Sequence, residues 1–247
     1  MKIGVFKFAS CDGCQLAFFD ISDRLLALPV EIEYFLEAQS ENKFGEFDLS
    51  FVEGSISTPE EEERIKEIRK KSKRVITIGA CADSGGIQSI RNFMNFNEVL
   101  SSVYPSPEYI KSLEKSKPVS DYIDVDFEIR GCPINKEHLY ESIVSLLMDK
   151  TPSLPEYPLC LECKRNGNPC VLILGKPCLG SIIKAGCGAI CPSYSTGCYG
   201  CFGPISDPNI DSLQEIFEER GWGNIFNRIL TSFNAYNNVY RERYEKD

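Results

Sequence analysis

The segment KIGVFKFASCDGC, residues 2–14, decides how the rest of the sequence is interpreted. Its first half, Lys2–Phe8, is rich in β-branched and aromatic residues and predicts a buried strand. That strand opens directly onto a loop in which Cys11 and Cys14 flank Gly13. In open parallel sheets, ligands bind in the crevice beyond the carboxyl ends of the strands. The segment therefore predicts an α/β protein that carries thiol groups at this edge.

The first 150 residues continue as an alternation of strands and helices. Thr58 is a good N-cap, Pro59 suits the first helical position, and acidic residues fill the first turn of the helix that follows. The alternation implies a doubly wound parallel sheet. The further predicted strands are 30–36, 48–52, 74–78 and 122–129; the predicted helices are 15–28, 59–71, 87–100 and 136–148.

The pattern changes after residue 150. Residues 151–158 contain three prolines, which is a linker composition, and predict a boundary between domains 1–150 and 151–247. Eight cysteines lie between Cys160 and Cys201, a region without a long periodic segment. We expect that this region builds no ordinary apolar core and is held together by something else. Helices are predicted over 211–220 and 225–244, so the second domain is loop-rich with C-terminal helices.

Composition limits the function. The chain has 247 residues, with 27 Lys and Arg against 36 Asp and Glu, a net charge of −9 that disfavours nucleic acid or an anionic membrane as partner. Apolar runs are far shorter than the roughly 18–20 residues that span a bilayer, and the first residues do not have the pattern of a signal peptide. We therefore expect a reducing, cytoplasmic location, in which twelve cysteines favour metal binding over disulfides.

Four cysteines of the first domain follow predicted strands. Cys11 and Cys14 follow the first strand, Cys81 the fourth and Cys132 the fifth, so the topology should gather them at one edge. Four thiolates at one place suit a tetrahedral zinc ion or an iron–sulfur cluster. Four buried cysteines that act as small apolar side chains are the alternative, but these would have no reason to follow strand ends.

The other eight cysteines form two groups of four, each with one CxxC pair. Zinc knuckles would also explain CxxC pairs. However, three sets of four thiols with a single histidine in the chain suit iron–sulfur chemistry better than three structural zinc ions, and several clusters in one chain suit an electron relay. The groups are Cys160-x2-Cys163-x6-Cys170-x7-Cys178 and Cys187-x3-Cys191-x6-Cys198-x2-Cys201.

These motifs together resemble the small subunit of nickel–iron hydrogenases and, more distantly, the 20 kDa-type subunit of respiratory complex I. The closest resemblance is to the cytoplasmic sulfhydrogenase delta and deazaflavin-reducing hydrogenase gamma subunits, and it extends over nearly the whole chain. It rests on Ser10-Cys11-x-Gly13-Cys14, Val52-Glu53-Gly54-Ser55, Gly79-Ala80-Cys81, Gly131-Cys132-Pro133, Cys160-Leu161-Glu162-Cys163 and Cys198-Tyr199-Gly200-Cys201.

The resemblance implies a flavodoxin-like first domain that holds a proximal cluster, facing a nickel–iron centre in a separate large subunit. It further implies a medial and a distal cluster in the second domain and a flavin- or iron–sulfur-bearing partner that exchanges electrons with them. By resemblance the ligands are Cys11, Cys14, Cys81 and Cys132 (proximal), Cys187, Cys191, Cys198 and Cys201 (medial), and Cys160, Cys163, Cys170 and Cys178 (distal).

Two departures from membrane-associated relatives matter. Cys160 stands where they have a histidine ligand, and Cys191 supplies a fourth thiolate that their three-iron medial cluster lacks. Both changes imply three 4Fe–4S clusters, with a lowered distal potential that suits a nicotinamide, deazaflavin or ferredoxin acceptor. We expect neither the twin-arginine leader nor the membrane anchor of exported relatives. Complex I relatives carry a tandem Cys-Cys, whereas here Cys11 and Cys14 are separated.

The remaining polar residues give weaker signals. Glu53 follows a predicted strand and is either an accessory acid near the proximal cluster, even a ligand, or a solvated or interface carboxylate. His138 is expected to be a surface or capping residue. We expect no catalytic residue in this chain, because the dihydrogen chemistry would belong to the large subunit. A zinc-stabilised scaffold, a quinone-reducing complex I-like subunit, and a module of another oxidoreductase, such as a heterodisulfide reductase or formate system, remain alternatives.

Overall fold

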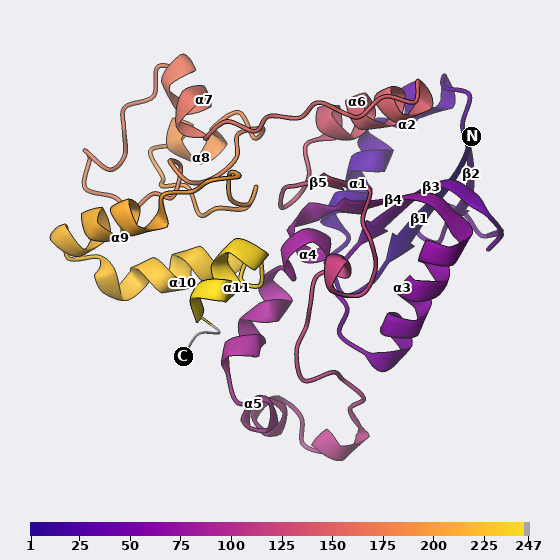
Figure 1. Ribbon diagram of the computed structural model, residues 1–247, viewed down its shortest axis with the longest axis horizontal. Coiled ribbons are helices and arrows are strands. Elements are labelled where there is room, and N and C mark those ends of the chain that lie inside the picture. The colour runs from indigo at the N-terminus through magenta and orange to yellow at the C-terminus, as the bar shows by residue number, and fades with distance from the viewer. Residues whose placement is uncertain (245–247) are drawn as a thin grey trace.

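The fold is built on a five-stranded parallel sheet with strand order β2-β1-β3-β4-β5, and the computed structural model describes residues 1–244 (Figure 1). All four neighbouring strand pairs are parallel. This order is that of flavodoxin-like proteins, and it confirms the predicted doubly wound sheet. The strands are β1 (Lys2–Lys7), β2 (Glu31–Phe35), β3 (Phe47–Glu53), β4 (Ser72–Ile78) and β5 (Phe127–Ile129).

Successive strand residues point to opposite sides of the sheet, and helices cover both sides, so both faces of the sheet are buried. Val5 and Phe51 lie in one apolar cluster with residues of helices α1, α2 and α6. Their neighbours Phe6 and Val52 lie in a second cluster with residues of α3 on the other face. The helices of this region are α1 (Gly13–Asp20), α2 (Ser22–Leu26), α3 (Pro59–Lys71), α4 (Gly79–Ser84), α5 (Phe96–Val103) and α6 (Lys136–Leu147), with 3-10 turns η1 (Ile87–Phe93), η2 (Pro107–Tyr109) and η3 (Val119–Asp121).

Helix α3 begins and ends where the sequence predicts. The Thr58 hydroxyl accepts a hydrogen bond from the Glu61 backbone N–H at 3.1 Å, and the Glu61 carboxylate accepts one from the Thr58 N–H at 3.0 Å. This reciprocal pair satisfies backbone donors that a helix N-terminus leaves without partners. Three basic residues in the last turn complement the helix dipole.

Two predicted helices of the first lobe are each divided. The helix predicted over 15–28 breaks at Ile21, whose non-helical backbone lets the side chain bury in the core between α1 and α2. The segment predicted over 87–100 becomes η1 followed by α5. Asn95 begins α5 as its N-cap, since its side chain accepts hydrogen bonds from two backbone N–H groups of the first turn.

The strand predicted over 122–129 is wrong for its first five residues. Only β5 pairs with β4, while η3 and a loop precede it. The reason is Asp126, whose carboxylate accepts the Val75 backbone N–H at 2.7 Å. The Asp126 carboxylate therefore occupies a backbone N–H of β4 that a longer β5 would have bonded. The pairing of β5 with β4 begins only at Phe127.

The helix predicted over 225–244 is divided at residues 234–237, where the chain docks onto α4. The Tyr236 N–H donates to the Ser84 carbonyl at 3.1 Å, and the Asn237 amide donates to the Ser84 hydroxyl at 3.1 Å. These tertiary hydrogen bonds replace the helical ones. The helices after residue 150 are α7 (Cys160–Arg165), α8 (Ile190–Ser193), α9 (Ile210–Glu219), α10 (Gly223–Phe233) and α11 (Asn238–Tyr244).

The cysteine-rich region has an apolar core after all, which corrects our expectation. Leu179 and Ile183 from the loops cluster with Phe217, Phe226 and Tyr240 from α9, α10 and α11. The C-terminal helices thus supply the large side chains that the loops lack. Figure 1 shows this part as a lobe beside the sheet. The division into domains 1–150 and 151–247 stays a prediction, and residues 245–247 lie outside the described residues.

Within residues 1–244 we find no helix whose length and apolar character would let it cross a membrane.

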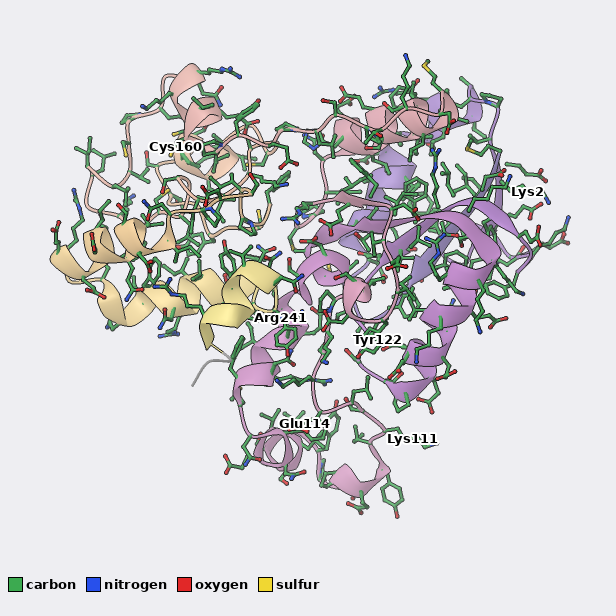
Figure 2. All side chains as sticks on the ribbon, viewed as in Figure 1. Lys2, Lys111, Glu114, Tyr122, Cys160 and Arg241 are labelled. Carbon is green, nitrogen blue, oxygen red and sulfur yellow. The ribbon has the colours of Figure 1, made fainter. Side chains whose placement is uncertain are left out.

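Arg241 ties the last helix to the first lobe, and its removal should destabilise the protein. Its guanidinium contacts both carboxylate oxygens of Asp121 at 2.9 and 2.8 Å, and Figure 2 places it at the junction of the two lobes. Because this pair is bidentate and partly buried, we expect Arg241→Ala to lower the free energy of unfolding by about 1–2 kcal/mol. Arg243→Ala on the same helix is the control, since its partner Asp211 is exposed. Equal losses in denaturant unfolding would contradict the role given to Arg241.

Candidate functional site

The four cysteines of the first lobe meet at the carboxyl edge of the sheet. Cys11 and Cys14 follow β1, Cys81 lies in α4 directly after β4, and Cys132 follows β5. The strand order reverses between β1 and β3, and such a switch point opens a crevice at this edge. A cavity of about 270 Å³ is lined by Cys11, Cys81 and Cys132. We call these four cysteines the first group.

Two glycines make room for the sulfur atoms of the first group. A Cβ placed on Gly79 would lie 2.4 Å from the Sγ of Cys14, and one on Gly86 would lie 2.6 Å from the Sγ of Cys81. Both glycines also have positive φ angles, +83° and +63°, which L-residues adopt at a cost. The backbone therefore bends round the thiols in a way that excludes any other residue at these positions.

Burial sets the electrostatics of this group. It raises the pKa of Cys14 and Cys132, and it raises the pKa of Cys81 to about 11. The charges of other thiols in the group raise the pKa of each of these three further, which reflects their proximity. Buried thiols with raised pKa values stay protonated at neutral pH unless a cation compensates the thiolate charge. The donor set therefore fits a group that brings positive charge.

The second group consists of Cys160, Cys163, Cys170 and Cys178 in the other lobe (Figure 2 labels Cys160). The Sγ atoms of Cys160 and Cys178 lie 3.6 and 3.5 Å from the position of a Cβ on Gly180. Burial raises the pKa of Cys160 to about 11, and the charges of the other three thiols add to this. Cys178 is buried, whereas Cys170 is exposed on the loop after α7.

The third group consists of Cys187, Cys191, Cys198 and Cys201 and lies between the other two. Burial raises the pKa of Cys201 to about 12 and that of Cys187 and Cys198 as well. Cys191 lies in the short helix α8. The charges of Cys187 and Cys191 both act on Cys201, so the loops bring residues 187–201 to one place.

The third group lies beside both of the others. Cys132 of the first group is close enough to Cys201 of the third for its charge to raise the pKa of that thiol and for its backbone to lower it. The backbone N–H of Cys198 in the third group donates to the Sγ of Cys178 in the second at 3.2 Å. The order in space is therefore first, third, second, which differs from the order along the chain. Across residues 1–244, no three His, Cys, Asp or Glu side chains converge closely enough to hold a single metal ion.

Glu53 lies at the crevice, as its place after β3 predicts, but it is not solvated. Its exposed fraction is 1%, and its carboxylate accepts hydrogen bonds from the Cys14 N–H at 3.1 Å and the Gln15 side-chain amide at 2.8 Å. Burial raises its pKa, and its charge in turn raises that of Cys14. The alternative of a solvated carboxylate is therefore wrong, and its role as an accessory acid stays a prediction.

The sequence did not predict that Gln88 and Arg130 lie beside the cysteine groups, and it predicted the wrong environment for His138. Gln88 lies with its Nε2 3.6 Å from the Sγ of Cys81 and 2.6 Å from the Ala9 carbonyl, so its amide faces a predicted ligand. His138 is half-buried against Phe202, and Asn135 caps α6 instead. The expectation of a surface or capping histidine is therefore wrong.

Arg130, two residues before Cys132, is the other residue that the sequence did not reveal. Its guanidinium lies 2.7 Å from a Glu128 carboxylate oxygen and 3.3 Å from one of Asp83. Asp83 in turn lies two residues after Cys81, so this partly buried network connects the segments that carry two cysteines of the first group. Burial, and then the neighbouring Asp83 charge, raises the pKa of Glu128 to about 7.

Comparison with known proteins places the chain among redox subunits. Residues 11–146 match the family described as NADH ubiquinone oxidoreductase, 20 Kd subunit. The chain is 38% identical to the delta subunit of sulfhydrogenase 2 of Pyrococcus furiosus over 222 residues, which cover 89% of this chain and 93% of that protein. It is 36% identical to a subunit of the F420-non-reducing hydrogenase vhu of Methanocaldococcus jannaschii over 243 residues, with 85% and 84% covered.

Solved structures share the fold. An NAD+-reducing [NiFe]-hydrogenase in the H2-reduced state superposes with a TM-score of 0.57 at 26% identity, covering 63% of this chain and 95% of that one. The [NiFeSe]-hydrogenase of Dm. baculatum superposes with a TM-score of 0.54 over 85% of this chain and 96% of that one. The second pair is only 18% identical and shows the fold alone.

The raised pKa of Glu128 makes a testable contribution to stability. Between its usual pKa of 4.5 and about 7, the unfolded chain has lost this proton while the folded chain keeps it, so stability falls as pH rises through this window. We expect Glu128→Gln to remove this fall. The free energy of unfolding of the unmodified protein, relative to that of Glu128→Gln, should fall by on the order of 1 kcal/mol from pH 4.5 to 7, once solvent screening is allowed for. Above pH 7 the difference between the two proteins should stay constant. Thermal unfolding across pH measures it, and a difference that does not vary with pH contradicts it.

Proposed function

The chain belongs to the family of the 20 kDa subunit of NADH ubiquinone oxidoreductase, alongside subunits of sulfhydrogenase and F420-non-reducing hydrogenase, and we propose that it relays electrons through three iron–sulfur clusters. It is a subunit of a hydrogenase oxidoreductase complex. In the proposed complex the chain connects the nickel–iron centre of a large subunit to a flavin- or iron–sulfur-bearing partner. The complex is proposed to work in the cytoplasm, with no nucleic-acid partner and no direct insertion into a membrane.

The line of three thiol groups is the observation that carries the proposal. A relay needs neighbouring redox centres in single file. Here Cys201 of the third group lies close to Cys132 of the first, and the Cys198 N–H of the third group donates to the Sγ of Cys178 in the second at 3.2 Å. Purely structural metal sites would have no need for such contacts between sites. The middle position of Cys187, Cys191, Cys198 and Cys201 supports their assignment as medial ligands, with Cys160, Cys163, Cys170 and Cys178 as distal ligands.

The first group, Cys11, Cys14, Cys81 and Cys132, would hold the proximal cluster. Cys160 and Cys191 would complete the distal and medial sets with thiolates, so each cluster would be of the 4Fe–4S type. When bound, each cluster takes up and releases one electron. The cavity of about 270 Å³ among Cys11, Cys81 and Cys132 offers space for a multi-atom group at the proximal site.

Residues of this chain tune and protect the proposed clusters. Peptide N–H groups donate to the Sγ atoms of Cys178 and Cys198 at 3.2 and 3.3 Å, and such donors raise the potential of a bound cluster by stabilising its more negative state. The Gln88 amide, 3.6 Å from Cys81, would act in the same way at the proximal site. The surrounding apolar clusters keep water away, which favours the less charged state of each cluster.

The large subunit would dock at the edge that carries Cys11. This cysteine is exposed, and Ile87, which lines the same cavity, and Leu16 in α1 are exposed apolar side chains. Apolar surface of this kind suits a permanent subunit contact. The dihydrogen chemistry would occur across this contact, in the partner.

Iron content tests the proposed function directly. The complex, purified anaerobically, should contain about twelve iron atoms in this chain and absorb broadly near 400 nm. Cys170→Ala, Cys191→Ala and Cys11→Ala should each alter the EPR signal of a different cluster, because one ligand is removed from each group. A colourless protein with zinc in place of iron would favour a structural scaffold, and two variants that alter the same signal would overturn the grouping.

Gly79 tests the proximal site without removing a ligand. We expect Gly79→Ala to lose the proximal cluster, about four iron atoms, because the new Cβ would meet the Sγ of Cys14 at 2.4 Å. Gly221→Ala is the matched control. Its φ of +74° carries a similar backbone cost, but no atom lies within 4 Å of the added Cβ. Iron analysis and EPR should show the loss of the cluster in Gly79→Ala only. An equal loss in both variants would contradict the inference that the cluster needs the space beside Gly79.

A further inference from the structure

Glu162 lies in the sequence motif of the second cysteine group but contacts the loop of the third. It stands in α7 between Cys160 and Cys163, both of the second group. Its Oε1 atom nevertheless accepts the backbone N–H of Gly186 at 2.9 Å, and Gly186 directly precedes Cys187 of the third group. This carboxylate therefore lies beside a cysteine group other than the one whose motif contains it.

The Glu162 carboxylate has no cation to compensate its charge. Its second oxygen, Oε2, is buried and has neither a hydrogen-bond partner nor an ion pair among the residues that the structure describes. Two basic residues of this lobe are engaged elsewhere: Lys184 pairs with Glu156, and Arg165 lies over the Tyr157 ring at 5.4 Å. A buried carboxylate oxygen without a partner is costly, so the stability of the protein alone does not account for it.

Other side chains also hold the loop that Glu162 contacts. The Asn135 amide donates to the Gly186 carbonyl at 2.7 Å, and the Asn166 amide donates to the Gly188 carbonyl at 2.8 Å. These bonds keep the loop before α8 against α7, and the two short helices lie side by side in this lobe (Figure 1). The position of the loop therefore does not depend on Glu162 alone, and the Glu162 charge can be removed without releasing the loop.

The Glu162 carboxylate disfavours negative charge at the third group in two ways. Burial raises the pKa of Cys187, and the charge of Glu162 raises it further. A reduced iron–sulfur cluster carries one more negative charge than the oxidised cluster, so a nearby carboxylate disfavours reduction for the same reason. The carboxylate also occupies the Gly186 N–H, a donor that is then not available to sulfur.

We propose that Glu162 is a positioning residue that lowers the potential of the cluster held by the third group, Cys187, Cys191, Cys198 and Cys201. This inference rests on the proposed function, because it needs a cluster at that group. The step that Glu162 affects is the uptake of one electron by this cluster and its release to a neighbouring cluster; the carboxylate itself exchanges neither an electron nor a proton. A middle centre of higher potential than its neighbours would retain electrons, and the Glu162 charge acts against this.

A redox titration of the intact complex tests the proposal. The complex of this chain and its large subunit is purified anaerobically, and EPR gives the midpoint potential of each cluster; the third-group signal is the one that Cys191→Ala alters. We expect Glu162→Gln to favour the reduced form of that cluster about tenfold, a rise of about 59 mV for one electron. The amide keeps an acceptor for the Gly186 N–H but carries no charge. The other two clusters should shift by less than about threefold.

Two control variants separate the charge of Glu162 from other effects. Glu162→Asp keeps the carboxylate charge, so the reduction equilibrium of the third-group cluster should stay within about threefold of that in the unmodified complex. Glu219→Gln removes one negative charge from an exposed position of the same lobe, where solvent and salt screen it. This second control should leave all three equilibria within about twofold, and both control variants should keep the iron content of the unmodified complex.

The outcomes separate a tuning role from a structural one. An unchanged third-group potential in Glu162→Gln would overturn the proposal, as would a larger shift at the second group. Equal shifts in Glu162→Gln and Glu162→Asp, or loss of the third-group cluster from Glu162→Gln, would show that the side chain only supports the loop, and would overturn it too. In all these cases the unmodified complex still shows three clusters, and the proposed function stands. If the unmodified complex contains no iron, the proposed function fails, and the tuning role fails with it.

Discussion

The cost of burying thiols is the constraint on which the rest of this structure depends. Burial raises the pKa of at least one cysteine in each of the three groups, so in the protein alone these side chains are poor thiolates. A bound group that brings positive charge reverses this balance, and its binding energy becomes folding energy. In the second lobe, α7 and α8 have six and four residues and cannot be stable alone. Their order depends on the apolar side chains that α9 and α10 supply and, in the proposed relay, would also depend on the clusters that the thiols would hold.

The parallel sheet solves a different problem, that of gathering residues that lie far apart in sequence. Cys14 and Cys132 are more than a hundred positions apart, yet each follows a strand whose carboxyl end reaches the same edge. Because strands are stiff and their order is fixed by pairing, only the short turns after them need to adapt. Gly79 and Gly86 provide that adaptation with backbone angles and free space that no other residue offers. The fold thus gives the position of the site, and two glycines give its shape.

Local signals in the sequence carried much of this information, and tertiary contacts explain the rest. The capping box of α3 and the cysteines after β1, β4 and β5 could be predicted because both depend on neighbours in sequence. The division of the last helix could not, because it arises from hydrogen bonds between residues 236–237 and Ser84. The same holds for Gln88, which faces Cys81 across a turn that begins with two glycines, and for the line of the three groups, which depends on the proximity of Cys132 and Cys201.

The two ends of that line differ in a way that bears on how such a relay would be used. At the Cys11 end the exposed side chains beside the site are apolar, as in contacts that form once and persist. At the Cys170 end the apolar Ile173 and Leu174 are exposed close in sequence to the basic Lys176. In the proposed relay, the three cysteine groups would hold the partners at these two ends apart.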